Sequence, residues 1–337
     1  MRTVGDCRKY NLRRKWVPSR DDHALVIRPS RIEDRKLMKR RYSTPEHALA
    51  EGQGGPSRLP PRPVGATMLY VASSHGFGLW LLLGLALAVG IYPSGRGNAL
   101  VPLALGAVLV GPGLLAACAH AAWMPTWHGW RIGKSARPTR DALVALSTCL
   151  PVLAVAGLAR GDNSFWVTRL AGAALALCSL ASLILTAHGD AIRRVPSLDT
   201  RLATQLPLSR VVSAAFGGGL WLWMCAAGQD NAVSAGQQLN WIITLLAVTL
   251  LRGLIENLRW QSVLLRLPGP RPLLELQPRR FVAALLVYAL PCAALLLASV
   301  RDVGPVLAAV AAVSCLTGMG IELSLYDGAL AALPDDR

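Results

Sequence analysis

The chain has 337 residues, of which 53% are hydrophobic, yet its formal net charge at pH 7 is +16. This combination argues against a single soluble domain, because the charges are segregated: 16 of the 35 Lys and Arg residues lie in residues 1–66. The other cations mostly flank apolar runs, a distribution that is typical of membrane proteins and argues against nucleic-acid binding.

Residues 1–66 form a basic segment with little hydrophobic periodicity. The segment ends in residues 52–63, a Gly- and Pro-rich stretch typical of a linker. It has too few apolar residues to build a core, so the sequence predicts a disordered tail. No apolar h-region follows the basic start, and no secretory signal peptide is therefore predicted.

Residues 67–330 are predicted to form an all-α membrane domain with about eight transmembrane helices. A span needs roughly 20 apolar residues to cross a bilayer. The expected spans are approximately residues 69–92, 99–123, 142–159, 165–187, 208–227, 239–258, 281–300 and 304–323. Short and longer connections alternate along the chain, which predicts four helical hairpins in series.

The distribution of cations predicts the orientation of these spans. With eight spans, both termini and the three longer connections lie on one side, and these connections contain Arg131, Lys134, Arg137, Arg140, Arg193, Arg194, Arg201, Arg259, Arg266, Arg271, Arg279 and Arg280. The opposite side has only Arg96, Arg160 and Arg301, with Arg169 just inside its span. The positive-inside rule therefore places both termini in the cytoplasm, and we expect a bacterial inner-membrane protein.

The seven cysteines do not have the spacing of a metal site. None forms a C-x-x-C pair, and six lie in or beside apolar runs, where they are expected to act as small buried hydrophobes. The sequence thus predicts no iron–sulfur, zinc or other metal site and no disulfide framework. If the protein takes part in redox chemistry, we expect the metal clusters in a partner.

Ionisable residues near the span ends are the functional candidates, because charge inside a membrane is costly. In the expected topology they all lie in the cytoplasmic half: His75, His120, Asp141, His188, Asp190, Arg252, Glu256 and Glu322. A one-sided layer suits a lipid-soluble substrate, such as a quinol, that exchanges protons with one aqueous face. A transporter usually needs polar groups at the middle of the membrane.

These residues also have structural interpretations. His75, near the start of the first span, is expected to be an interfacial residue. Arg252 and Glu256 have the i,i+4 spacing of a pair that neutralises itself. Glu322 has no such neighbour along its helix, which favours a functional role. For the histidines that end the second and fourth spans, both interpretations stay open.

Several segments carry a family resemblance: Gly76–Leu85, Gly113–His120, Gly129–Arg131, Thr139–Leu143 and Ala191–Thr200. They resemble, respectively, the opening helix, the end of the second helix and the following loop segments of the anchor subunit of dimethyl sulfoxide reductase-type molybdoenzymes. The resemblance covers about residues 67–330. Asp141 stands where the family usually has glutamate, and the family has no counterpart of the tail.

The resemblance implies that the chain oxidises quinol, typically menaquinol, and binds no metal or haem itself. The quinol-binding residues implied by the resemblance are His120 and Asp141. Trp127 and Trp130, in the loop between them, are expected to form an interfacial aromatic belt and, in a secondary role, to flank the quinone head group. Secondary candidates are His188, Glu256 and Glu322. The implied partners are a four-cluster ferredoxin-like iron–sulfur subunit, which would dock against Arg131, Arg193 and Arg194, and a molybdopterin catalytic subunit.

Two alternatives stay open at this point. A b-type cytochrome-like electron carrier would use His120 and His188 as axial ligands, because both end helices on the same side. A polytopic transporter would need a polar path through the span centres, which contain mainly Gly, Ala and Leu.

Overall fold

The structure, a computed structural model, describes residues 64–92, 98–118, 140–158, 165–194, 200–229, 235–264, 271–300 and 305–331. At several helix ends, residues 141–143 and 188–194 among them, only the backbone is described. All described residues belong to one compact unit, Arg58–Arg337. The predicted tail therefore lies outside the described residues, apart from its last three, which begin the first helix.

All the described elements are helices, as the sequence predicts. They are α3 (Val64–Val89), α4 (Leu100–Cys118), α5 (Arg140–Ser147), α6 (Cys149–Leu158), α7 (Trp166–Arg194), α8 (Thr200–Ala227), α9 (Ala235–Leu264), α10 (Arg271–Ala284), the π-helical turn η1 (Leu285–Ala289), α11 (Leu290–Val300) and α12 (Pro305–Ala331). Helices α5 and α6 form one interrupted stretch, and α10, η1 and α11 form another. Each of the eight described ranges thus contains one helical stretch, and each overlaps an expected span.

Six of these stretches are long and apolar enough to cross a membrane. The other two contain shorter apolar helices, Leu100–Leu114 and Val144–Leu158, so the total of eight spans stays a prediction. Large apolar side chains such as Leu150, Phe281 and Val306 are exposed. Lipid would cover them in a bilayer, which is consistent with the predicted membrane domain.

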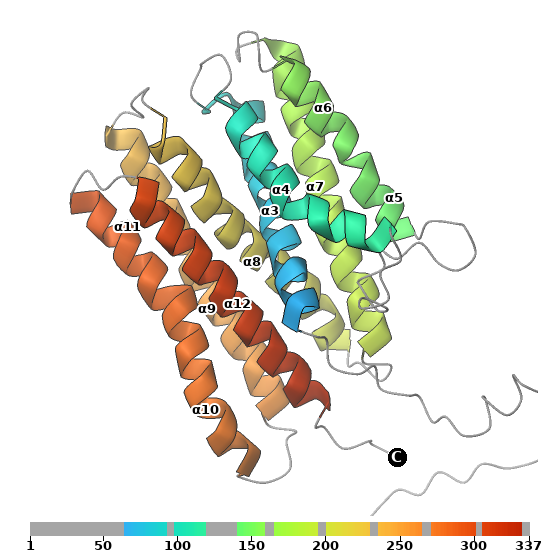
Figure 1. Ribbon diagram of the computed structural model, residues 1–337, viewed down its shortest axis with the longest axis vertical. Coiled ribbons are helices and arrows are strands. Elements are labelled where there is room, and N and C mark those ends of the chain that lie inside the picture. The colour runs from blue at the N-terminus through green and yellow to red at the C-terminus, as the bar shows by residue number, and fades with distance from the viewer. Residues whose placement is uncertain are drawn as a thin grey trace, which may run out of the picture. The chain divides into compact units, whose positions relative to one another are not determined.

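Helices α3 and α8 lie at the centre of the bundle. α3 contacts α4, α7, α8 and α12, whereas α8 contacts α3, α7, α9 and α12. Figure 1 shows the green helices α5, α6 and α7 on one side and the orange-to-red helices α9 to α12 on the other, with the blue α3 and the yellow α8 between them. Two buried apolar clusters follow the same division, one mainly from α3 to α7 and the other mainly from α8 to α12.

The helix contacts of the first half recur in the second half. α3 contacts α4 and α7, and correspondingly α8 contacts α9 and α12. α6 contacts α4 and α7, as α11 contacts α9 and α12. Between the halves, the contact of α12 with α3 corresponds to that of α7 with α8. The membrane domain therefore has the contact pattern of a twofold repeat of four helical stretches, an arrangement known among membrane proteins.

The central helices of the two halves are also similar in sequence. Residues 71–83 align without gaps with residues 212–224, at a separation of 141 residues. Six aligned pairs are identical: Val71 and Val212, Gly76 and Gly217, Gly78 and Gly219, Leu79 and Leu220, Trp80 and Trp221, and Leu81 and Leu222. Sequence and contacts together indicate an internal repeat of about 140 residues.

Glycines allow α3 and α8 to cross at close range. A Cβ atom on Gly78 would overlap the carbonyl of Ala214, and one on Gly218 would overlap the backbone of Gly78. Small residues at helix crossings let backbones approach closely inside a membrane, where van der Waals packing drives association. Direct backbone packing thus joins the two halves.

The predicted topology can be tested with reporter fusions. A reporter after Arg337 and one inserted in residues 229–238 should report opposite sides of the membrane, with the C-terminal one in the cytoplasm, because the cations are so unevenly distributed. Alkaline phosphatase and fluorescent-protein activities measure this directly. A C-terminal reporter that is active outside the cytoplasm would reverse the orientation of every helix.

Candidate functional site

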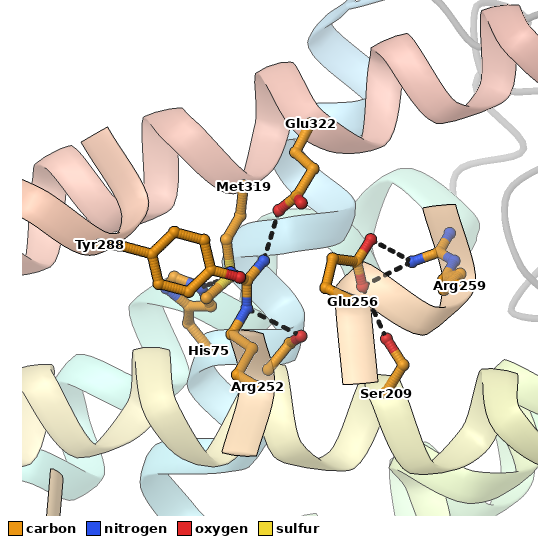
Figure 2. A network of polar contacts seen from close by, with 9 residues as sticks. His75, Ser209, Arg252, Glu256, Arg259, Tyr288, Met319 and Glu322 are labelled. Atoms are coloured by element: carbon orange, nitrogen blue, oxygen red, sulfur yellow. Dashed lines mark hydrogen bonds and ion pairs between the residues drawn. The ribbon is translucent and has the colours of Figure 1, made fainter. Parts of the chain in front are cut away.

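Arg252, on α9, is the centre of a network of buried polar side chains. Its side chain is 4% exposed, although the helix around it is rich in leucine. Nε donates a hydrogen bond to Ser213 Oγ at 3.1 Å, Nη1 to Tyr288 Oη at 2.5 Å, and Nη2 to Glu322 Oε2 at 2.5 Å (Figure 2). A buried charge is tolerated only when it is paired and hydrogen-bonded. One guanidinium thus connects α9 with α8, η1 and α12.

Tyr288 belongs to η1, where the helix widens by one π-helical turn. The backbone N–H of Leu290 donates to the carbonyl of Leu285, the wide bond that defines such a turn. A π-turn shifts the helical register by one residue and is frequent at functional sites. Here the hydroxyl of the tyrosine in this turn meets Arg252.

The network continues from Arg252 toward the end of α9. One turn further along, Glu256 Oε2 accepts a hydrogen bond from Ser209 Oγ at 3.1 Å. Its two carboxylate oxygens lie 3.2 and 3.3 Å from Nη1 of Arg259. Arg259 in turn lies over the ring of Tyr326, 3.6 Å from its centroid. The buried charges therefore extend toward the end of the bundle that is predicted to face the cytoplasm.

The ion pairs differ from those suggested by helical spacing. Arg252 pairs with Glu322 on another helix rather than with Glu256, and Glu256 pairs with Arg259 at i,i+3. Glu322, which lacks a neighbour of opposite charge along its own helix, has its partner on α9. The expectation that Arg252 and Glu256 neutralise each other is wrong, because α12 brings a carboxylate to Arg252.

His75 lies inside the bundle, and the expectation of an interfacial residue is wrong. Its relative exposure is 0%. Helix α3 begins at Val64, so His75 lies about three turns into the helix. Gly217 of α8 faces it, and a Cβ atom there would overlap the imidazole ring. The glycine in α8 thus leaves the space that the ring occupies.

The contact of His75 with Met319 defines the tautomer of the imidazole. Nε2 lies 3.2 Å from Met319 Sδ. A thioether sulfur carries no proton, so Nε2–H must be the donor of this hydrogen bond, and Nδ1 of the neutral ring is then an acceptor. Nδ1 is buried and has no hydrogen-bond partner among the residues that the structure describes.

His75 lies beside the Arg252 network. Met319 precedes Glu322 by three residues on α12, so both side chains lie on one face of that helix. Figure 2 shows His75 and Met319 near Arg252 and Tyr288. The structure thus brings an imidazole, a guanidinium, a phenol and a carboxylate together within an apolar bundle.

The other predicted site residues lie at or beyond the limits of the described chain. His120, Trp127, Trp130 and Arg131 lie outside the described residues. The backbone of Asp141 lies in the first turn of α5, and those of His188, Arg193 and Arg194 in the last turns of α7, but their side chains are not described. The quinol site and docking surface implied by the resemblance therefore stay predictions, whereas Glu256 and Glu322 join one network.

Several members of the network were not predicted from the sequence. Tyr288, Ser209 and Ser213 are ordinary residues in amphipathic or apolar helices. One feature of the sequence could have drawn attention to Tyr288, because it is the only tyrosine in the apolar run 281–300. No signal along the chain shows that these residues face Arg252 and Glu256, because they lie on other helices.

The network has the groups needed to bind and deprotonate a hydroxyl: an unprotonated imidazole nitrogen, a phenol and two carboxylates. Its ionisable groups come from four elements: His75 from α3, Arg252, Glu256 and Arg259 from α9, Tyr288 from η1, and Glu322 from α12. No protein-family model, curated protein or solved structure matches the chain, so its function is inferred from this arrangement and from the sequence pattern.

Proposed function

We propose that the chain is the membrane anchor subunit of a dimethyl sulfoxide reductase-like molybdopterin oxidoreductase in a bacterial inner membrane, where it oxidises quinol. The observation that carries this proposal is the buried network around Arg252, which joins α8, α9, η1 and α12 within an apolar bundle and includes Glu256 one turn further along α9. A quinol enters from the lipid and needs proton acceptors that lead to one aqueous face. The resemblance of the loop segments supports the same function.

The proposed reaction releases electrons that partner subunits must accept. Oxidation breaks the two O–H bonds of the quinol and leaves a quinone, two protons and two electrons. The protons pass to side chains of this chain and then to water. The electrons pass to the clusters of an iron–sulfur subunit, which we place beside Arg131, Arg193 and Arg194, and from there to the molybdopterin subunit.

Deletion of the gene in the native organism tests this role. Membranes of the deletion strain should lose quinol-linked reduction of S-oxides or N-oxides. A reduced dye that feeds the catalytic subunit directly should still support reduction, now partly in the soluble fraction, because the anchor is missing. Unchanged quinol-linked reduction in membranes without this chain would overturn the proposal.

Substitution of His120 tests the quinol site implied by the resemblance. His120→Ala should lower quinol-linked activity by about 100-fold, since a positioned acid–base group contributes that much to a rate. Dye-linked activity in the same membranes should stay normal. If both activities are normal, His120 is an interfacial residue. If both fall together, assembly is broken and the Asp141→Asn variant becomes the test of the site.

The b-type cytochrome alternative depends on His120 and His188, whose side chains are not described. The His75–Met319 pair does not fit a haem, because axial ligands lie on opposite faces of the iron and these two side chains are in direct contact. An absorbance spectrum separates the alternatives. A stoichiometric Soret band that disappears in His188→Ala would favour the cytochrome.

The transporter alternative gains one observation from the fold. Transporters are often built from internal repeats with their site where the repeats meet, and His75 lies where α3 contacts α8 and α12. The deletion experiment separates this function as well. Membranes that lack the chain but retain full quinol-linked activity would leave the transporter as the better interpretation.

A further inference from the structure

We propose that Nδ1 of His75 binds a hydroxyl group of the substrate between α3, α8 and α12 and takes its proton. This inference rests on the proposed function only in identifying the hydroxyl as that of a quinol. It assigns the site to a residue for which neither the helical spacing nor the family resemblance predicts such a role.

The first observation is the unpartnered nitrogen itself. Native proteins rarely bury a hydrogen-bond acceptor without a donor, because the lost hydration is not replaced. The hydrogen bond from Nε2 to Met319 leaves Nδ1 as the acceptor, and the described residues offer it no donor. A ligand with a hydroxyl group would supply one.

The second observation is that the position of the ring is built by both neighbouring helices. Gly217 of α8 leaves space for the imidazole, and Met319 of α12 fixes its orientation. Met319 is unbranched and flexible, so it can move when a substrate enters. The ring therefore lies in a defined tautomer beside a side chain that can be displaced.

The third observation comes from comparing the two halves of the repeat. At a separation of 140 residues, Thr148 corresponds to Tyr288, and Ser182 corresponds to Glu322. Thr148 lies at the interruption between α5 and α6, as Tyr288 lies in η1. Their oxygens form a neutral pair, with Thr148 Oγ1 3.1 Å from Ser182 Oγ.

At the two positions that correspond to Tyr288 and Glu322, the first half thus has small neutral side chains. In the alignment of the central helices, the residue that corresponds to His75 is Phe216. The imidazole of His75 is present in the first half only, and the guanidinium of Arg252 and the carboxylate of Glu322 are present in the second half only, so none of the three groups is repeated. A role in binding or proton transfer explains this difference between the halves.

The chemistry of the site suits a quinol. The neutral Nδ1 accepts the hydrogen bond of one hydroxyl group and then its proton, while the electrons leave to the iron–sulfur partner. Glu322, which lies one turn from Met319 on α12 and pairs with Arg252, is the carboxylate of the network that accepts each proton from the ring. The second proton follows the same route once the ring is neutral again.

Nitrogen NMR of the full chain in lipid nanodiscs tests the binding step. The protein is labelled with ¹⁵N-histidine, and the His75 signals among the six histidines are assigned with His75→Gln. Addition of a short-chain naphthoquinol should shift the Nδ1 resonance toward that of a hydrogen-bonded nitrogen. The dimethyl ether of the same naphthoquinol, which has no donor, should leave it unchanged.

Two substitutions test the proton-transfer step in native membranes. Asparagine retains an acceptor close to the position of Nδ1, whereas glutamine places its amide near Nε2. His75→Asn should therefore keep the KM for quinol and lower kcat by about 100-fold, since an amide takes no proton. His75→Gln should in addition raise KM by about tenfold, the factor that corresponds to one lost hydrogen bond. Ser182→Ala, at the position of the first half that corresponds to Glu322, is the matched control and should change neither.

The outcomes separate this inference from the proposed function. Normal quinol-linked activity in His75→Gln, or an Nδ1 signal that naphthoquinol does not shift in an active complex, overturns the role of His75 and leaves the anchor function. A shifted Nδ1 signal in a protein whose deletion does not affect quinol-linked activity supports the site and overturns the anchor function.

Discussion

Replacement of Arg252 by leucine should destabilise the membrane domain by about 3–5 kcal/mol, the usual cost of removing one partner of a buried ion pair. The variant leaves Glu322 in an apolar bundle without its guanidinium and removes the hydrogen bonds to Tyr288 and Ser213. The double variant Arg252→Leu/Glu322→Leu should recover most of this loss, because no unpaired charge remains.

Unfolding of the purified protein in mixed micelles measures these differences. Ser182→Ala is the matched control, since Ser182 occupies the position of Glu322 in the first half and makes a neutral hydrogen bond. Ser182→Ala should lower the free energy of unfolding by about 1 kcal/mol or less. If Arg252→Leu is no less stable than the double variant, the ion pair does not stabilise the contact of α9 with α12.

Substitution of Gly78 by valine should separate the two halves of the bundle and prevent accumulation of folded protein. Even a Cβ atom at this position would overlap the carbonyl of Ala214, and backbone atoms cannot move aside without separating α3 from α8. We expect the free energy of unfolding to fall by more than about 4 kcal/mol, as it does for severe packing defects. Gly218→Val, on the facing helix, should have the same effect.

Gly111→Ala in α4 and Gly157→Ala in α6 are the controls for this experiment. A Cβ atom on either residue would meet nothing within 4 Å, so these variants should be neutral or more stable by up to about 1 kcal/mol, as expected for alanine in a helix. The yield of monodisperse protein after size-exclusion chromatography compares all four variants. Equal yields would show that α3 and α8 do not cross at Gly78.

The sequence predicts the positions of the helices well and their ends less well. Every expected span overlaps a helical stretch, because a run of about 20 apolar residues can be recognised directly in the sequence. Helix α12, however, continues to Ala331, eight residues beyond the expected span 304–323. Hydropathy reports where lipid can cover a helix, whereas backbone hydrogen bonds continue into polar residues. Helix α3 likewise begins at Val64, five residues before the expected span 69–92.

The interruptions of the helices were not predicted. α5 and α6 meet at Thr148, and a π-turn separates α10 from α11. Both segments are continuous apolar runs in the sequence. The wide turn of η1 places Tyr288 against Arg252, and this contact depends on a neighbouring helix rather than on the composition of the run.

The sequence by itself determined the all-helical class and the positions of the apolar helices. These properties depend on composition and on spacing along the chain, which can be read locally. Only the tertiary structure decided that Arg252 pairs with Glu322, that Glu256 pairs with Arg259 and that His75 is buried against Gly217 and Met319. The reason is physical: the partners of Arg252 and His75 lie on other helices, up to 244 residues away along the chain, and only the packing of α3, α8, α9 and α12 brings them within hydrogen-bonding distance.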